Sequence, residues 1–232
     1  MKKSNSTGAP MNRQEVLAGL FYMAFQFVFL PAMLRSVSAM LPRPLSEAEL
    51  NFTYYLINFL TMTVLFHDFL GKSLRYACTH PIDLIQAVIL GLVAYYACMF
   101  AVEKAVDWLM PGFANRNNDS IFAMFRSSRY LMFIGTVILV PPFEECLFRG
   151  LVFRSLYGKS RWAAYAVSIG AFAMIHIAGY LGVYSPVEIL VAVVQYIPAG
   201  LWLAWSYTKS GSIFAPIAIH AAVNYITING LR

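Results

Sequence analysis

Hydrophobic residues are gathered into long blocks, separated by short stretches that are polar or contain Pro and Gly. A helix that spans a bilayer needs about 20 mostly apolar residues, and most of these blocks approach or exceed that length. We therefore predict an all-α fold, a polytopic transmembrane helical bundle with about seven or eight spans. The blocks cover residues 16–40, 51–70, 82–110, 129–148, 162–181, 187–207 and 212–229.

The stretches between blocks predict how the helices are connected. Apart from 42–44, they are short: 71–75, 111–112 with 115–119, and 158–161. Short connections join antiparallel neighbours in helical bundles. We expect 115–119 to be a mobile loop that divides the chain into two regions, 1–128 without a recognised motif and 129–232 with the candidate chemistry.

Composition supports a lipid environment. The chain is 59% hydrophobic and 12% charged, with a mean hydropathy of +0.63. Soluble domains are about 45–50% apolar and about a quarter charged. The net charge of +6 comes from Lys and Arg scattered at block ends rather than from a basic run. We therefore expect the lipid bilayer, and no nucleic acid, as a partner. The three cysteines lack metal-like spacing and are interpreted as small apolar residues.

The distribution of basic residues predicts orientation. With the N-terminus in the cytoplasm, nine Lys and Arg, including Lys2 and Lys3, lie on the cytoplasmic side, and six, including Arg232, lie opposite. This excess favours a cytoplasmic N-terminus.

Charged and polar residues interrupt the last apolar blocks. An ionised side chain at mid-bilayer costs at least about 2.5–3.5 kcal/mol, so such residues face the bundle interior and mark sites. Glu145 and Arg149 are four residues apart and share a helix face, which predicts an ion pair. Glu144 points elsewhere and stays available for proton transfer. Pro141 and Pro142 interrupt the helical backbone just before it.

The last apolar blocks carry three spaced motifs, Glu144-Glu145-x-x-x-Arg149, Phe172-x-x-x-His176 and His220-x-x-x-Asn224. These motifs resemble those of the CPBP family, which joins CAAX prenyl proteases to bacteriocin-processing and immunity (Abi) proteins. The residues around them agree as well: Phe-Arg-Gly follows the glutamates, and Gly211 to Pro216 precede the last motif. The resemblance covers about residues 130–228.

The resemblance implies an intramembrane endopeptidase that cleaves a membrane-associated protein or peptide. It implies that Glu144 and His176 activate water and that His220 and Asn224 hold the developing oxyanion. Glu145 and Arg149 complete the candidate catalytic set. No cofactor is expected, although a zinc ion bound by Glu144, His176 and His220 is the alternative. We expect an integral protein of a bacterial or archaeal cytoplasmic membrane, and the resemblance predicts neither the particular substrate nor the oligomeric state.

Other interpretations use the same residues. The ionisable groups could form the relay of a proton-coupled transporter or channel, or the chain could be a non-catalytic membrane scaffold. The polar side chains could also simply join helices. A thiol nucleophile at Cys146 is disfavoured by its apolar setting. His67 with Asp68, and His80 with Asp83, are predicted to be interfacial.

Overall fold

The computed structural model describes residues 8–230, and this part of the chain contains helices and no named strand. The predicted all-α fold is confirmed. The α-helices are α1 (Arg13–Val28), α2 (Leu30–Ala39), α3 (Glu47–Leu65), α4 (His67–Thr79), α5 (Pro81–Leu109), α6 (Arg116–Ser127), α7 (Arg129–Phe133), α8 (Val140–Glu145), α9 (Arg154–Tyr157), α10 (Arg161–Ile177), α11 (Pro186–Ser210) and α12 (Phe214–Asn229). Two π-helical segments, η1 (Ile134–Leu139) and η2 (Cys146–Phe153), and a 3₁₀ turn, η3 (Ala178–Tyr180), complete the set.

Local sequence explains where several helices begin and end. Asn12, Ser46 and Ser185 each form a capping box with a glutamate three residues later, which satisfies the free N–H groups of the first turns of α1, α3 and α11. Helix α11 ends at Gly211, whose φ of 70° is left-handed and favours glycine. These capping residues define where the helices begin and end.

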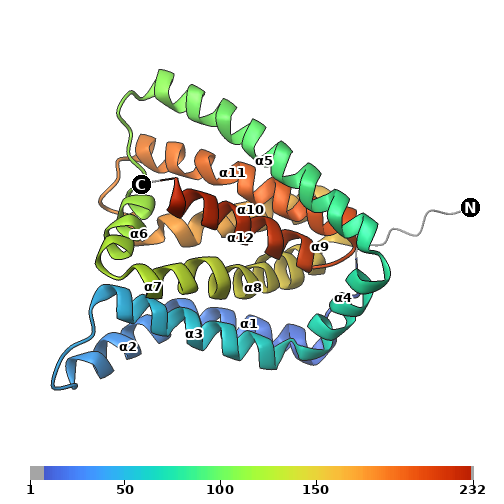
Figure 1. Ribbon diagram of the computed structural model, residues 1–232, viewed down its shortest axis with the longest axis horizontal. Coiled ribbons are helices and arrows are strands. Elements are labelled where there is room, and N and C mark those ends of the chain that lie inside the picture. The colour runs from blue at the N-terminus through green and yellow to red at the C-terminus, as the bar shows by residue number, and fades with distance from the viewer. Residues whose placement is uncertain (1–7, 231–232) are drawn as a thin grey trace, which may run out of the picture.

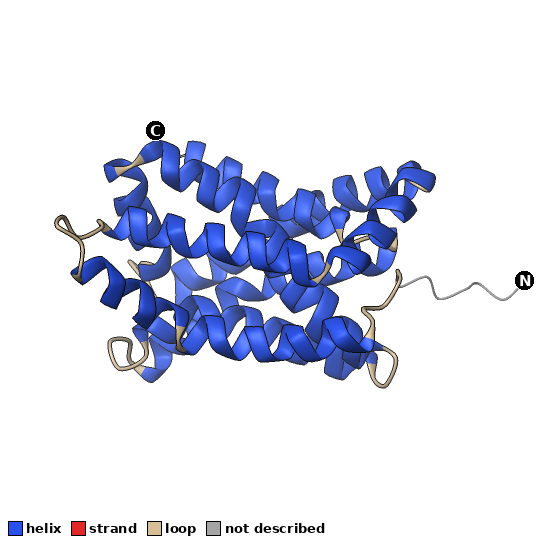
Figure 2. Cartoon of the chain, turned by 90° about the horizontal axis from the view of Figure 1, so that it is seen from below, coloured by secondary structure: helices blue, strands red, loops and turns tan. Residues whose placement is uncertain are grey.

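One long helix forms the centre of the bundle. Segments α7 to α9, with η1 and η2 between them, run continuously from Arg129 to Tyr157, and 67% of their apolar stretch is buried. The same helix lies between α3 and α12 in Figure 1. Only 11% of the apolar stretch of α5 is buried, which makes α5 an outer helix. Figure 2 shows most loops at the two ends of the bundle, as expected for helices whose axes are roughly aligned.

Four helices of the described chain are long and apolar enough to cross a membrane: α5, the central helix, α10 through η3, and α11. A fifth is added if α1 and α2, which meet at a bend of 46°, form one broken span. The protein is therefore an integral membrane protein, but the predicted seven or eight spans are not confirmed. Helix α12 has 16 residues, fewer than the length that a full crossing needs.

Two expected connections are helical instead. Residues 71–75 lie inside α4, whose Phe69, Ser73 and Ala77 are buried while its charged positions are exposed. Such spacing is typical of an amphipathic helix. The prediction of a mobile loop at 115–119 is also wrong, because Asn115 caps the start of α6. Lys2, Lys3 and Arg232, used for orientation, lie outside the described residues, and the cytoplasmic N-terminus stays a prediction.

Candidate active site

The backbone of the central helix is irregular next to the glutamates. The N–H of Val140 donates to the carbonyl of Gly135, five residues back, which is the π-helical pattern. In that pattern the next N–H would bond the carbonyl of Thr136, but residue 141 is a proline and has no N–H. The side-chain amide of Asn224 donates to this carbonyl at 2.8 Å instead. Because Pro141 has no N–H, the carbonyl of Thr136 accepts from Asn224 and holds this side chain of α12 in place.

Glu145 and Arg149 form the ion pair that their spacing predicts. Nη1 of Arg149 lies 3.0 Å from Oε1 of Glu145, and both side chains are fully buried. The guanidinium also donates to the carbonyls of Ala199 and Gly200 in α11, and it lies over the ring of Phe172 in α10. The buried ion pair therefore links the central helix to α10 and α11.

His220 contacts both glutamates. Its Nδ1 lies 2.8 Å from Oε1 of Glu145, and its Nε2 lies 3.9 Å from Oε2 of Glu144, which is too long for a hydrogen bond. An ionised carboxylate only accepts, so opposite an ionised Glu145 the proton is on Nδ1. For Nε2 to donate as well, the ring must then be the doubly protonated imidazolium.

His176 is held in one orientation by its neighbours on two helices. Its Nδ1 donates to the carbonyl of Phe172 at 2.7 Å. Its ring lies between Phe172 and Tyr196, with centroid distances of 4.6 and 4.5 Å. With its proton on Nδ1, a neutral His176 keeps Nε2 as an acceptor. This tautomer suits a group that receives a proton.

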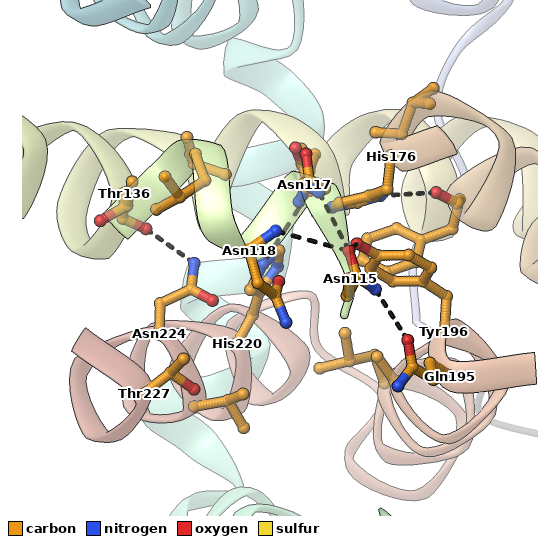
Figure 3. A pocket seen from close by; sticks show the side chains of 18 of the residues that line it. Asn115, Asn117, Asn118, Thr136, His176, Gln195, Tyr196, His220, Asn224 and Thr227 are labelled. Atoms are coloured by element: carbon orange, nitrogen blue, oxygen red, sulfur yellow. Dashed lines mark hydrogen bonds and ion pairs between the residues drawn. The ribbon is translucent and has the colours of Figure 1, made fainter. Parts of the chain in front are cut away.

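A cavity of about 800 Å³ brings together four of the six candidate residues. Glu144 from α8, His176 from α10, and His220 and Asn224 from α12 all line it. Figure 3 shows His176, His220 and Asn224 around this cavity. Glu145 and Arg149 do not line this cavity and lie behind its wall. Four residues, on three elements, share one space although the chain separates the first from the last by 80 positions.

Further polar residues line the cavity without belonging to any motif. Asn115 donates from its amide to Gln195 at 2.9 Å and accepts from the hydroxyl of Tyr196 at 3.4 Å. Thr136 lies on the opposite side, near Asn224 (Figure 3). Sequence reasoning missed these residues. A polar residue in an apolar block was the only available signal, and Gln195, Tyr196 and Thr136 each provide it.

The other candidates lie away from this cavity. Cys146 is buried but does not line it. His67 and Asp68 contact each other at 3.1 Å on the exposed surface, as expected for interfacial residues. His80 is exposed and stacks on Tyr76. None of these residues shares the space of Glu144.

A zinc site is not formed by the described side chains as they stand. Within residues 8–230, no group of three or more His, Cys, Asp or Glu has the arrangement that could hold a metal ion. Glu144, His176 and His220 are therefore not placed as a ligand set, and Nδ1 of His220 is already directed at Glu145.

These features define an integral membrane protein with a cavity between helices that is lined by Glu144, His176 and His220. Residues 126–226 match the model of the family described as type II CAAX prenyl endopeptidase Rce1-like. The match covers rather less than half of the chain but includes all three motifs, and it confirms the resemblance to the CPBP family. This region of the chain is therefore similar to a family of CAAX-protease-type endopeptidases. Comparisons with curated proteins and with solved structures give no match.

Proposed function

We propose that the protein is an intramembrane endopeptidase of the glutamate type, which hydrolyses a peptide bond of a membrane-associated protein or peptide. The observation that carries the proposal is the single cavity lined by Glu144, His176, His220 and Asn224. A carboxylate that is 7% exposed inside an apolar helix is costly, and a role in proton transfer accounts for its presence.

In the proposed reaction, Glu144 removes a proton from a water molecule, and the resulting hydroxide attacks the peptide carbonyl carbon. His176 can accept a hydrogen bond or a proton at Nε2, because Nδ1 is bound to Phe172. The proton taken from water is then delivered to the leaving nitrogen as the C–N bond breaks. Such acid–base groups typically contribute 10²–10⁴-fold to the rate.

His220 and Asn224 would stabilise the tetrahedral oxyanion. As an imidazolium, His220 donates from Nε2, while Nδ1 stays bound to Glu145. The amide nitrogen of Asn224 has a second hydrogen besides the one directed to Thr136. One such donor typically contributes about 10²–10³-fold. Glu145 and Arg149, which lie behind the wall, are proposed as positioning residues for His220.

A proteolysis assay on the full chain in detergent or lipid tests the proposal. We expect Glu144→Gln to lower turnover by about 10²–10⁴-fold, with the melting temperature little changed. Asp107→Asn is the matched control, because it makes the same acid-to-amide change at an exposed position of α5 outside the cavity. Equal activity of the Glu144→Gln variant and the wild type would overturn the mechanism. Absence of any peptide hydrolysis by the wild type would favour the transporter or scaffold interpretation.

A further inference from the structure

Helix α4 is fixed at one end of the bundle by buried hydrogen bonds at two points (Figure 1). In its first turn, the N–H of Phe69 donates to Oε1 of Glu15 in α1 at 2.8 Å. Near its middle, Oγ of Ser73 accepts from the N–H of Ile213 at 2.8 Å, and the hydroxyl of Ser212 donates to the carbonyl of Ser73 at 3.1 Å. These bonds hold α4 against the start of α1 and the connection between α11 and α12.

Exposed basic residues gather at this end of the bundle. Helix α4 carries two of them, and the contact of Ser73 with Ser212 brings the end of α11, with a third, beside α4. The first turn of α1 and the segment that follows α9 supply the others, and Figure 1 shows α9 at the same end as α4. We call the following six exposed residues the basic face: Arg13, Lys72, Arg75, Lys159, Arg161 and Lys209.

The positive charge of the basic face is not matched by neighbouring acids. Within residues 8–230, none of its six residues takes part in an ion pair. Of the acidic residues at this end, Glu15 is buried and bound to backbone N–H groups, and Asp68 lies 3.1 Å from His67. Asp83 at the start of α5 is half-buried. The face therefore keeps a net positive charge.

The opposite end of the bundle differs, because acidic side chains there bind arginines directly. Arg35 donates to both oxygens of Glu47 at 3.1 and 3.2 Å. Arg43 donates to both oxygens of Glu49 at 2.7 and 3.2 Å. These paired hydrogen bonds use the guanidinium groups within the chain. The charges that are free to bind an external anion are therefore concentrated at the α4 end.

The basic face borders the apolar surface that faces lipid. Trp162 directly follows Arg161 and is 87% exposed, and tryptophan is typical of the membrane–water interface. Ile82 and Ile85, in the first turns of the lipid-exposed helix α5, are also exposed. On α4 itself, exposed Leu74 lies between Lys72 and Arg75 in the sequence. Cations next to such residues lie at the depth of the lipid headgroups rather than in bulk water.

We propose that the basic face binds the headgroups of anionic phospholipids, with Lys72, Arg75 and Lys209 as its centre. The unpaired cations complement the headgroup phosphates, and the apolar border accommodates the acyl chains of the same lipids. A basic residue near an anionic membrane surface strengthens binding by about fivefold. The proposal concerns a surface outside the active-site cavity and does not depend on the endopeptidase function.

Native mass spectrometry of the full chain in micelles tests the proposal. The micelles contain equal amounts of phosphatidylglycerol and phosphatidylcholine, and the ratio of the two lipids bound is measured. One triple variant combines Lys72→Gln, Arg75→Gln and Lys209→Gln. The matched control removes three exposed basic residues of the opposite end, as Lys104→Gln, Arg126→Gln and Arg129→Gln.

We expect the wild type and the control variant to prefer phosphatidylglycerol. The ratio should fall by at least about fivefold in the variant of the basic face. Equal ratios in the two triple variants, or no preference in the wild type, would overturn the proposal. Lys72→Arg with Lys209→Arg keeps the charge and should keep the ratio; its loss there would assign the effect to side-chain packing and overturn the electrostatic account.

Salt and free phosphate provide a test on the wild type that does not depend on the folding of any variant. Sodium chloride should lower the preference for phosphatidylglycerol, because the basic face is exposed to solvent. Sodium phosphate at the same ionic strength should lower it no further. A preference that salt leaves unchanged would overturn the proposal. Stronger competition by inorganic phosphate than by chloride would assign the face to a soluble phosphate and would also overturn it.

Discussion

One carboxylate oxygen of Glu145 contacts both His220 and Arg149. Oε1 of Glu145 lies 2.8 Å from Nδ1 of His220 and 3.0 Å from Nη1 of Arg149. One carboxylate thus fixes an imidazole of α12 to a cation of the central helix. His220 lines the cavity and Glu145 does not, so His220 links this carboxylate to the site.

The first prediction concerns this buried pair. Arg149→Ala removes the guanidinium that pairs with the carboxylate of Glu145, and breaking a buried pair in this way typically costs about 3–5 kcal/mol. Replacing both partners, as Glu145→Gln with Arg149→Met, should destabilise the protein less than Arg149→Ala alone. Thermal melts in detergent of Glu145→Gln, Arg149→Met and the double variant complete the cycle. Strictly additive losses would mean that the two side chains do not interact.

The second prediction concerns Tyr196, whose ring packs against that of His176. Tyr196→Phe keeps the aromatic contact at 4.5 Å and removes only the hydroxyl that binds Asn115. Tyr196→Leu removes this contact between rings, and an aromatic pair of this kind contributes about 0.5–1.5 kcal/mol. We expect kcat to fall by about 2–10-fold in the leucine variant, with KM little changed and the pH profile shifted. Activity and pH profile of the phenylalanine variant should stay close to those of the wild type. The same loss in both variants would assign the effect to the hydroxyl.

The third prediction concerns the carbonyl of Thr136. Pro141→Ala restores an N–H that can bond this carbonyl and displace the amide of Asn224. We expect kcat to fall while the melting temperature stays the same or rises, because the backbone gains a hydrogen bond. Asn224→Ala should lose about one oxyanion donor, on the order of 10²–10³-fold. Asn224→Ala and the double variant should then be equally slow. Undiminished activity of Pro141→Ala would show that Thr136 does not orient Asn224.

The fourth prediction concerns metal. The described chain does not place Glu144, His176 and His220 as a ligand set, and the proposed mechanism routes no step through zinc. We expect dialysis against a chelator to leave proteolysis and the melting temperature unchanged. Stoichiometric zinc in the purified protein, with activity lost to the chelator and restored by zinc, would contradict the glutamate-type mechanism.

Part of this site follows from helical periodicity. Glu145 and Arg149 are four residues apart, and that spacing alone predicts their ion pair. The contact of His220 with Glu145 spans 75 residues and depends on how α12 packs on α8, which no local pattern specifies. The catalytic roles themselves remain predictions.

Residues 115–119 show why local polarity is misleading. Their Asn and Asp are typical of loops, yet Asn115 caps α6 and binds Gln195 of α11. A cap and a loop use the same residue types. The tertiary partner, 80 positions away, decides between them.

The outer position of α5 determines how a substrate would be encountered. Tyr96 and Phe100 line the cavity from a helix that is mostly exposed to lipid. A substrate anchored in the same leaflet would reach Glu144 by lateral diffusion, a search in two dimensions in which surface density replaces bulk concentration. Diluting such a substrate with inert detergent at constant total amount should therefore slow cleavage, whereas diluting the whole mixture with buffer should not.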